Sequence, residues 1–408
     1  MATPSRTEYS QPELSNVGII ALVPDLWEPK WQPRHQVLSR LAQYFHVVWV
    51  DAPPSWRRSL SALRSRRAAA KEAPPTPAGF EVYRPEFWLP RLGRPAWLGR
   101  LMSRERLKRA SDRLRARGCT KVVLYIWRPE FADAIDQTSY DLSVYHIDDE
   151  YSFSSTETEV SPVERRLLES VGQVFIHSPA LLRKKGGFNP HTEFVPNGVD
   201  YQLYATSAPE PEDLRDIPRP RIGYVGWIKR MVDWELLFEL SSIHPQWSFV
   251  FVGPKSPHSD IDDLLKRISD LPNVHFLGGK PTSSLGGYPQ HFDVCTMPYR
   301  LDDYTKYIYP LKMHEYLASG QPVVSAPICS VEEFAPVLGI ANSPENWSKA
   351  IEHALSGREN SPARRAARQK VARQHDWEVL VDKIACTISQ RLGIALPTAA
   401  GVNVEVGS

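Results

Sequence analysis

Short apolar segments rich in Val and Ile alternate with amphipathic segments along most of this chain, and that alternation limits the folds it can adopt. The runs Asn16–Pro24 and His46–Asp51 are apolar enough to be buried on both faces, and Arg34–Phe45 between them has a helical pattern. A buried strand, a helix and a second buried strand in this order form a βαβ unit, whose two strands are parallel. We therefore expect an α/β protein.

The alternation resumes after residue 120 and runs in two series. The first predicts strands at Lys121–Trp127, Leu142–Asp148, Gln173–His177 and Thr192–Pro196, with helices at Pro129–Gln137 and Pro179–Lys185. The second predicts strands at Arg221–Gly226, Trp247–Gly253, Asn273–Gly278, Phe292–Pro298 and Val323–Ala326, with helices at Val232–Ser242, Ile261–Leu271, Ser283–His291, Tyr309–Ser319, Glu345–Leu355, Pro362–Gln374 and Asp376–Leu392. The segment between the two series, 199–220, is rich in proline and acidic residues, which is typical of a linker.

Two series of this kind predict two doubly wound, Rossmann-like domains that face each other across a cleft. We expect an N-terminal domain at 16–200 with a basic insert at 52–120, a linker at 201–220 and a C-terminal domain at 221–375. A helix at 376–395 is expected to cross back to the first domain, and residues 1–15 and 396–408 are expected to be disordered. Ligands of such sheets bind outside the carboxyl ends of the strands, so the cleft is the expected active site.

Composition agrees with a protein that has two cores and argues against several classes. The chain has 408 residues, of which 42% are hydrophobic, and no apolar run approaches the length of a membrane span. Its first residues lack the apolar core of a signal peptide, so we expect a cytoplasmic protein. The four cysteines have no metal-ligand spacing, and we predict neither a disulfide framework nor a metal site.

One region is strongly basic. Between Asp51 and Thr120 there are seventeen Lys or Arg against six Asp or Glu, although the whole chain has a net charge of only +2. The arginines form two clusters, Trp56–Lys71 and Arg100–Arg117, with Trp and Leu residues between them. Three interpretations stay open: helices whose basic faces are merely solvated, a surface for anionic membrane lipids, or a nucleic-acid surface. Because Trp and Leu accompany the arginines, we favour the inner face of the cytoplasmic membrane. No nucleic-acid-binding motif is present, and we expect no nucleic acid.

A helix in the second domain carries a cation in an unusual place. Pro310, Gly320 and Pro322 delimit this helix at about 309–319, and Lys312 falls in its first turn. A cation there is disfavoured by the helix dipole, whereas phosphate binds well at helix N-termini. Glu315 shares a face with Lys312, and the simplest alternative is that the two form an ordinary surface ion pair.

A glycine turn in the same domain could also approach phosphate. Gly223 and Gly226 end the first strand of that domain, and Lys229 and Arg230 follow. Small residues at a junction between strand and helix let the backbone approach a diphosphate, which the cations could neutralise. The pattern is not a full G-x-G-x-x-G, and an ordinary turn is the alternative.

Taken in order, these motifs resemble the donor-nucleotide domain of GT-B type glycosyltransferases, in particular a bacterial family-4-like group that builds cell-envelope polysaccharides. The resemblance covers nearly all of residues 221–340. It implies that Glu315 bonds the ribose hydroxyls of a nucleotide sugar. It also implies that Gly226 and Lys229 contact the diphosphate, and that Lys312 supplies a second cation.

The chain departs from the commoner form of that family at one position. A first glutamate stands eight residues before the second in that form, and here the position is Tyr307. The chain instead fits a variant T-x-x-x-x-P-x-K-x-x-E, which adds Thr305 to the predicted donor site. A tyrosine supplies no carboxylate, so the resemblance leaves open how the transferred sugar is held.

The predicted acceptor side is the end of a strand in the first domain. His146, Asp148 and Asp149 follow one another closely there, and a carboxylate near a histidine could act as a general base or hold acceptor hydroxyls. Alternatively, Asp149 caps a helix and Asp148 bonds nearby backbone. His35 is a lesser candidate, and His177 is expected to lie in a turn or in the core.

The interpretation that we favour is a metal-independent, retaining glycosyltransferase that uses no cofactor. It would take a sugar from a nucleotide sugar and transfer it to a glycan or lipid-linked acceptor in cell-envelope or exopolysaccharide synthesis. Two alternatives stay open. A sugar-nucleotide epimerase could use the same two-domain plan, and a non-catalytic scaffold could have kept the fold while binding a partner.

Overall fold

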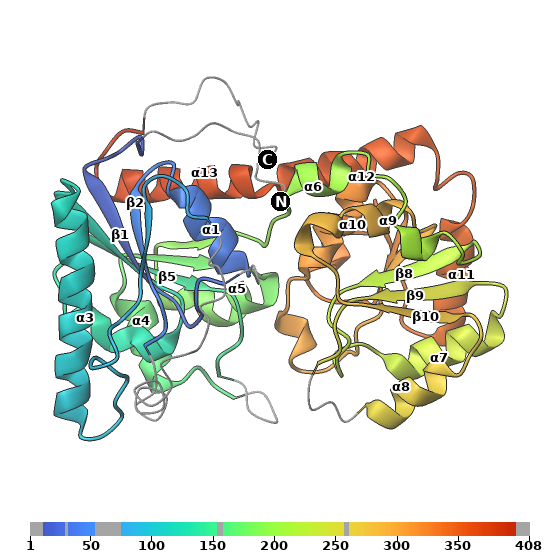
Figure 1. The fold of residues 1–408 in the computed structure, drawn as a ribbon, viewed down its shortest axis with the longest axis horizontal. Helices are drawn as coiled ribbons and strands as arrows, with labels where there is room; N and C mark the ends of the chain where they lie inside the picture. Colours follow the sequence, from blue (N-terminus) through green and yellow to red (C-terminus); the bar gives the residue numbers. More distant parts are fainter. Residues whose placement is uncertain (1–10, 29–31, 54–74, 153–157, 257–260, 397–408) are drawn as a thin grey trace.

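The structure, a computed structural model, describes residues 11–28, 32–53, 75–152, 158–256 and 261–396. It contains two α/β domains, each built on one parallel sheet with helices packed against it (Figure 1). This confirms the predicted fold class.

The N-terminal sheet has seven strands in the order β3-β2-β1-β4-β5-β6-β7. They are β1 (Val17–Leu22), β2 (His46–Val50), β3 (Phe80–Tyr83), β4 (Lys121–Ile126), β5 (Leu142–Ile147), β6 (Gln173–Ile176) and β7 (Thr192–Phe194). Every residue of β1, an interior strand, is buried, because helices cover both faces of the sheet.

Helices cover that sheet. They are α1 (Pro33–Leu41), α3 (Ala96–Ala116), α4 (Pro162–Ser170) and α5 (Pro179–Lys185), with 3₁₀ turns at Pro129–Asp136 and Gly186–Phe188. The first of these turns replaces the α-helix that we predicted at Pro129–Gln137. The predicted linker also contains a short helix, α6 (Tyr201–Ala205), and a 3₁₀ turn at Glu212–Leu214.

The C-terminal sheet has six strands in the order β10-β9-β8-β11-β12-β13. They are β8 (Arg221–Val225), β9 (Ser248–Val252), β10 (Val274–Gly278), β11 (Val294–Met297), β12 (Val323–Ser325) and β13 (Gly339–Ile340). The helices are α7 (Trp234–Ile243), α8 (Asp262–Ser269), α9 (Gly287–Gln290), α10 (Leu311–Ser319), α11 (Pro344–Ala354), α12 (Pro362–Gln374) and α13 (Trp377–Arg391), with 3₁₀ turns at Thr282–Ser284, Thr305–Tyr307 and Glu332–Phe334.

The last helix belongs to the core of the first domain. Buried residues of α13, among them Val381 and Ile384, lie in one hydrophobic cluster with residues of β1 and α1 (Figure 1). Where the chain passes between the domains, the Val199 amide donates to His375 O over 2.9 Å and the Trp377 amide donates to Val199 O over 3.0 Å. Two chain segments therefore run side by side between the domains.

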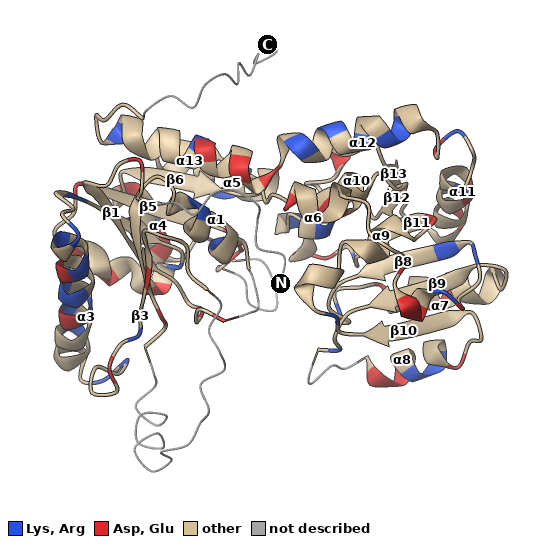
Figure 2. Ribbon diagram, turned by 45° about the horizontal axis from the view of Figure 1, so that its top comes forward, with Lys and Arg blue, Asp and Glu red and all other residues tan. Residues whose placement is uncertain are grey.

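Some predicted segments can be compared with the structure, and others lie outside the described residues. Residues 11–15, predicted to be disordered, are ordered here, because the Glu13 and Leu14 amides donate to the carbonyls of Gln43 and Tyr44. The rest of the N-terminal tail, the C-terminal tail from 397 and the arginine cluster at Trp56–Lys71 lie outside the described residues. The second arginine cluster forms much of α3, which carries a dense row of basic side chains (Figure 2). Within the described ranges, no helix combines the length and the apolar character that crossing a bilayer needs.

Candidate active site at the junction of the domains

Helix α10 begins and ends where its prolines and glycine predict, within two residues. Pro310 precedes the first helical residue in an extended conformation, and Gly320 ends the helix at φ +78°, where a side chain would be strained. Lys312 is therefore the second residue of the helix, and Glu315 lies almost one turn later. Both side chains are partly buried.

The turn after β8 meets the start of α10. Gly226 has φ +151°, and a β-carbon added to it would lie 3.1 Å from Cε and 3.2 Å from Nζ of Lys312. The Lys312 ammonium also donates to the hydroxyl of Tyr299 and lies 5.0 Å from the centroid of the Tyr224 ring. Although burial alone would lower the pKa of Lys312, these two tyrosines outweigh it, and the pKa is raised. The ammonium thus lies against bare backbone, as a phosphate site requires.

Lys229 brings a second cation to the same place. Burial lowers the pKa of its partly buried side chain, and the nearby charge of Lys312 lowers it further, whereas Asp149 of the other domain raises it. Two ammonium groups held close together in a partly buried site repel each other. A bound anion such as a diphosphate would relieve that repulsion.

Glu315 is held by a residue that the sequence did not single out. The carboxylate accepts a hydrogen bond from Tyr204 of α6, in the predicted linker. Burial raises the pKa of Glu315, while Lys312 and this hydrogen bond oppose the rise. Tyr204 is buried and close to α10 only because the linker folds as a helix, so no local pattern could have identified it.

Thr305 does not join this group in the contacts that the structure shows. It is buried, its Oγ1 donates to Asp302 O over 3.2 Å, and the Asp302 amide donates back to Oγ1 over 2.9 Å. In this structure Thr305 closes the turn that precedes α10, and its predicted donor contact stays a prediction.

Asp148 is likewise engaged in a structural contact. It forms an ion pair with Arg34, whose Nε lies 2.6 Å from Asp25, and it accepts a hydrogen bond from Tyr151. The side chains of Arg34 and Asp148 are only 8% and 5% exposed. In this structure Asp148 anchors the loop after β5, and its predicted catalytic role stays a prediction.

Asp149 is the acceptor-side residue that faces the C-terminal domain. Its Oδ1 accepts a hydrogen bond from the Glu150 amide over 2.8 Å and one from the hydroxyl of Tyr304 over 3.1 Å. Burial and then the charge of Asp148 raise the pKa of Asp149, which makes it a better proton acceptor. It does not cap α4, because Ser161 does so. Of the predicted acceptor residues, Asp149 alone comes close to the predicted donor residues.

The histidine candidates lie in the core. His146 is 4% exposed, is hydrogen-bonded to the Tyr125 hydroxyl over 2.7 Å and stacks on Trp127. Burial lowers the pKa of His146 well below the usual value, and its predicted part in catalysis stays a prediction. Burial also lowers the pKa of His177 to about 4, and His35 stacks on Trp27.

A buried charge network supports the loop that carries Asp148 and Asp149. Lys185 Nζ lies 3.0 Å from Glu150 Oε1 and 2.7 Å from Glu164 Oε1, and all three side chains are fully buried. Glu150 follows Asp149 directly, so the ion pair fixes the end of β5 against α4 and α5. Sequence reasoning missed this network because its members are far apart in the chain and follow no motif.

Tyr307 occupies the position where the resemblance expects a first glutamate. It is 4% exposed and belongs to the hydrophobic cluster of the N-terminal domain, and Lys184 Nζ lies 5.1 Å from the centroid of its ring. The side chain therefore packs across the junction onto the other domain.

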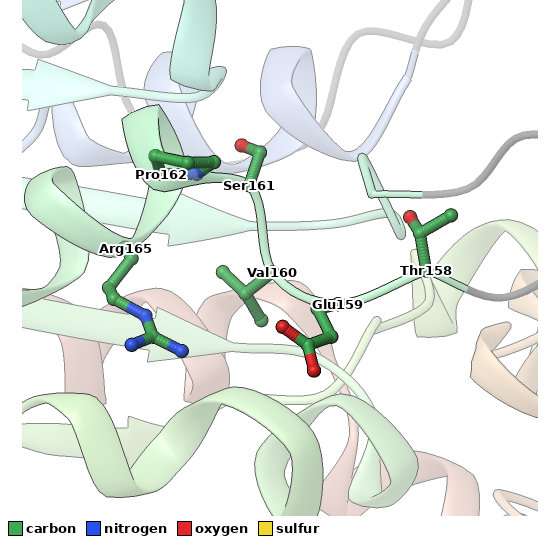
Figure 3. Close-up of a pocket in the computed structure, with 6 residues that line it drawn as sticks. All are labelled: Thr158, Glu159, Val160, Ser161, Pro162 and Arg165. Carbon is green, nitrogen blue, oxygen red and sulfur yellow. The ribbon is translucent and has the colours of Figure 1, made fainter.

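Two cavities lie elsewhere. One, of about 480 Å³, is formed by the local segment that leads into α4, and Figure 3 shows its lining of Thr158, Glu159, Val160, Ser161, Pro162 and Arg165. The other, of about 740 Å³, lies beside the linker and includes Asp213, Lys280 and Tyr288. None of the predicted site residues lines either cavity. No group of His, Cys, Asp or Glu among the described residues has the arrangement of a metal site.

The fold is similar to that of known glycosyltransferases. Two parallel α/β domains joined by two chain segments form the GT-B fold. Residues 219–357, about a third of the chain, match the family described as glycosyl transferases group 1, which confirms the resemblance.

Individual relatives agree with this class. The chain is 30% identical over 200 residues to TuaH of Bacillus subtilis (strain 168), a protein named as a glycosyltransferase of teichuronic acid biosynthesis. That match covers 47% of this chain and 49% of the relative, so the chain spans about half the length of the curated relative that it matches.

Solved structures share the fold over almost the whole chain. Anabaena HepE in complex with UDP and glucose superposes with a TM-score of 0.61 at 15% identity, covering 92% of this chain and 99% of that one. Sucrose-phosphate synthase from Thermosynechococcus elongatus superposes with a TM-score of 0.66 at 18% identity, covering 94% and 99%. At these identities the likeness shows the fold.

Proposed function

We propose that this protein transfers a sugar from a nucleotide diphosphate sugar to an acceptor held by its N-terminal domain. The observation that carries the proposal is the cluster in which Lys312 lies against the bare backbone of Gly226, with Lys229 beside it and Glu315 on the same helix. Two cations against a glycine turn suit a diphosphate, and a partly buried carboxylate suits a pair of ribose hydroxyls.

The chemistry follows from where charge develops. As the bond from sugar to phosphate breaks, negative charge grows on the leaving diphosphate oxygen, and the two lysines with the α10 N-terminus stabilise that charge. Asp149, with its raised pKa, accepts a hydrogen bond from the attacking hydroxyl and orients it. Metal independence and retention at the sugar carbon are part of the proposal and are supported by the family resemblance.

The substrates are proposed from the relatives. HepE was solved with UDP and glucose, so a UDP-sugar is the first donor to test. The Bacillus relative is named for teichuronic acid synthesis, which supports a cell-envelope glycan or lipid-linked acceptor. A cytoplasmic location, with attachment to the inner face of the membrane, completes the proposal.

A thermal-shift screen against UDP, GDP, dTDP, CMP and their sugars tests this function, because a ligand that binds only the folded state raises the unfolding temperature. At least one nucleotide should stabilise the wild-type protein and should stabilise Glu315→Ala less. Product analysis then separates the alternatives. An epimerase converts the nucleotide sugar with no acceptor present, whereas a transferase releases nucleotide only when an acceptor is added. A protein that none of these ligands stabilises would be a scaffold.

A further inference from the structure

The outer face of the N-terminal domain exposes large apolar side chains close together in the chain. Trp97 is 67% exposed, Trp88 54%, Leu101 53% and Phe87 46%. Scattered exposed apolar residues are ordinary, but two tryptophans, a phenylalanine and a leucine at the start of one helix and the turn before it are not.

Basic side chains share the exposed face of α3 with this apolar group. Trp97, Leu101, Arg104 and Lys108 follow one another at intervals of four, three and four residues, so they line one side of the helix. Arg100 lies one turn from Trp97 and Arg104. A helix with aromatic and basic side chains on one exposed face is the pattern of an interfacial helix.

The structure divides the basic cluster into two groups. Four arginines are used within the domain. Arg106 donates to the Leu89 and Pro90 carbonyls, Arg109 pairs with Glu86 and Glu105, and Arg113 and Arg117 pair with Glu81.

The other group faces outward. Arg94, Arg100, Arg104 and Lys108 are exposed and form no ion pair with any residue that the structure describes. Figure 2 shows Lys and Arg positions along much of α3. The α3 surface below means Trp97, Leu101, Arg100, Arg104 and Lys108, which share one side of the helix.

The α3 surface lies at the sheet edge that also carries Asp149. The turn with Phe87 and Trp88 follows the carboxyl end of β3, and α3 begins there. Side-chain contacts connect the segment before α3 to the acceptor loop: Arg91 pairs with Glu130 over 3.4 Å, Arg128 lies over the Tyr151 ring, and Tyr151 donates a hydrogen bond to Asp148. A partner that contacts the α3 surface would therefore lie on the acceptor side of the molecule.

We propose that the α3 surface docks on an anionic lipid bilayer, with Trp97 and Leu101 in the headgroup region and Arg100, Arg104 and Lys108 against the lipid phosphates. The attraction of several cations to an anionic leaflet and the burial of aromatic side chains act together, and neither needs a bound nucleotide. Docking would help an enzyme whose acceptor is lipid-linked, and that benefit rests on the proposed function. The docking itself does not depend on the proposed function.

Vesicle flotation tests this proposal with the full-length protein and no nucleotide. Wild-type protein should float with vesicles of phosphatidylcholine and 30% phosphatidylglycerol, should stay behind with pure phosphatidylcholine, and should detach as salt rises. The combined change Arg100→Gln, Arg104→Gln and Lys108→Gln should weaken the partition coefficient at least tenfold at low salt. Trp97→Ala alone should weaken it about threefold to tenfold.

A matched control removes the same charge elsewhere. Lys349, Arg358 and Lys370 are exposed in the C-terminal domain, and their triple change to Gln should leave flotation unaltered if the α3 surface is the docking site. Equal loss in both triple variants, no flotation of the wild type, or retention on nucleic acid without flotation would each overturn the proposal. Far-ultraviolet circular dichroism confirms that each variant is folded, and nucleotide thermal shifts, recorded separately, test the donor site independently.

Discussion

The hydroxyl of Tyr304 donates to Oδ1 of Asp149 over 3.1 Å, which joins the loop before α10 to the loop after β5 of the other domain. This hydrogen bond brings the one acceptor-side carboxylate with a raised pKa to the same junction as Lys229. Its neighbour Asp148 instead forms an ion pair with Arg34. Two adjacent aspartates thus have different environments, and they should behave differently when replaced.

Asp148→Asn should destabilise the protein by about 3 kcal/mol, because it removes a partner of the buried Arg34 guanidinium. Asp149→Asn should cost less than about 1 kcal/mol, since an asparagine oxygen can still accept both hydrogen bonds. Urea denaturation at pH 7 measures both changes. The reverse order of the two losses would show that Asp148 is not the structural residue.

The stability effect of Asp149→Asn should also depend on pH. An acid whose pKa is raised in the folded state holds its proton more tightly there, so its contribution to stability is present at low pH and is lost as the pH rises through the folded pKa. Asp149→Asn has no carboxyl group to titrate, so it does not lose stability in this way as the pH rises. Relative to the wild type, the variant should therefore gain stability between pH 3.8, the ordinary value for Asp, and neutral pH. Unfolding curves across this range should show that gain, and a pH-independent difference would contradict the raised pKa.

Lys229 should make nucleotide affinity sensitive to alkaline pH. Its pKa is lowered from the ordinary 10.5, so it loses its proton, and with it the attraction to a diphosphate, before an ordinary lysine would. Lys312, whose pKa is raised, stays charged over the same range. Calorimetric titration with UDP from pH 7 to 10 should show affinity falling for the wild type. Lys229→Arg, whose guanidinium stays charged, should remove most of that fall; an unchanged fall would exclude Lys229 from the site.

Gly226→Ala should damage the donor site more than the fold around it. The new methyl group would lie 3.1 Å from Lys312 Cε at a backbone conformation that strains any side chain, at a cost of about 1 to 3 kcal/mol. We expect at least tenfold weaker UDP binding by calorimetry. Gly279→Ala is the matched control, because its added carbon would meet only ordinary contacts at 3.5 Å or more. Equal UDP affinities in the two variants would show that Gly226 is not part of the phosphate site.

Tyr307 should matter for docking of the domains rather than for nucleotide binding. Tyr307→Ala removes a ring that is 4% exposed from the cluster it joins in the other domain, and should cost about 3 kcal/mol. Tyr307→Phe keeps the ring and should leave UDP affinity within about threefold of wild type, because ring packing dominates its contacts. Thermal unfolding and calorimetry measure these effects. A large loss of UDP affinity in Tyr307→Phe would mean that the hydroxyl binds the donor.

Much of the donor side could be predicted because its determinants are local. Pro310, Gly320 and the spacing of Lys312 from Glu315 define one helix, and Gly226 defines one turn, whatever the rest of the chain does. The predicted roles of His146, Asp148 and Thr305 stay predictions, because the side chain of each is bound by residues distant in the chain or by its own turn, which the sequence did not indicate. Sequence proximity alone could not separate Asp148 from Asp149.

The sequence by itself determined the two parallel sheets, the positions of most helices and the pairing of Gly226 with Lys312 and Glu315 in one domain, because periodicity and chain-breaking residues act over a few positions. The tertiary structure alone decided which carboxylate faces the junction, that Tyr204 holds Glu315 and that Tyr307 packs on the other domain. It also decided which arginines of the basic cluster stay outward. These outcomes depend on contacts between residues far apart in the chain, whose burial and charge exist only once both domains have folded.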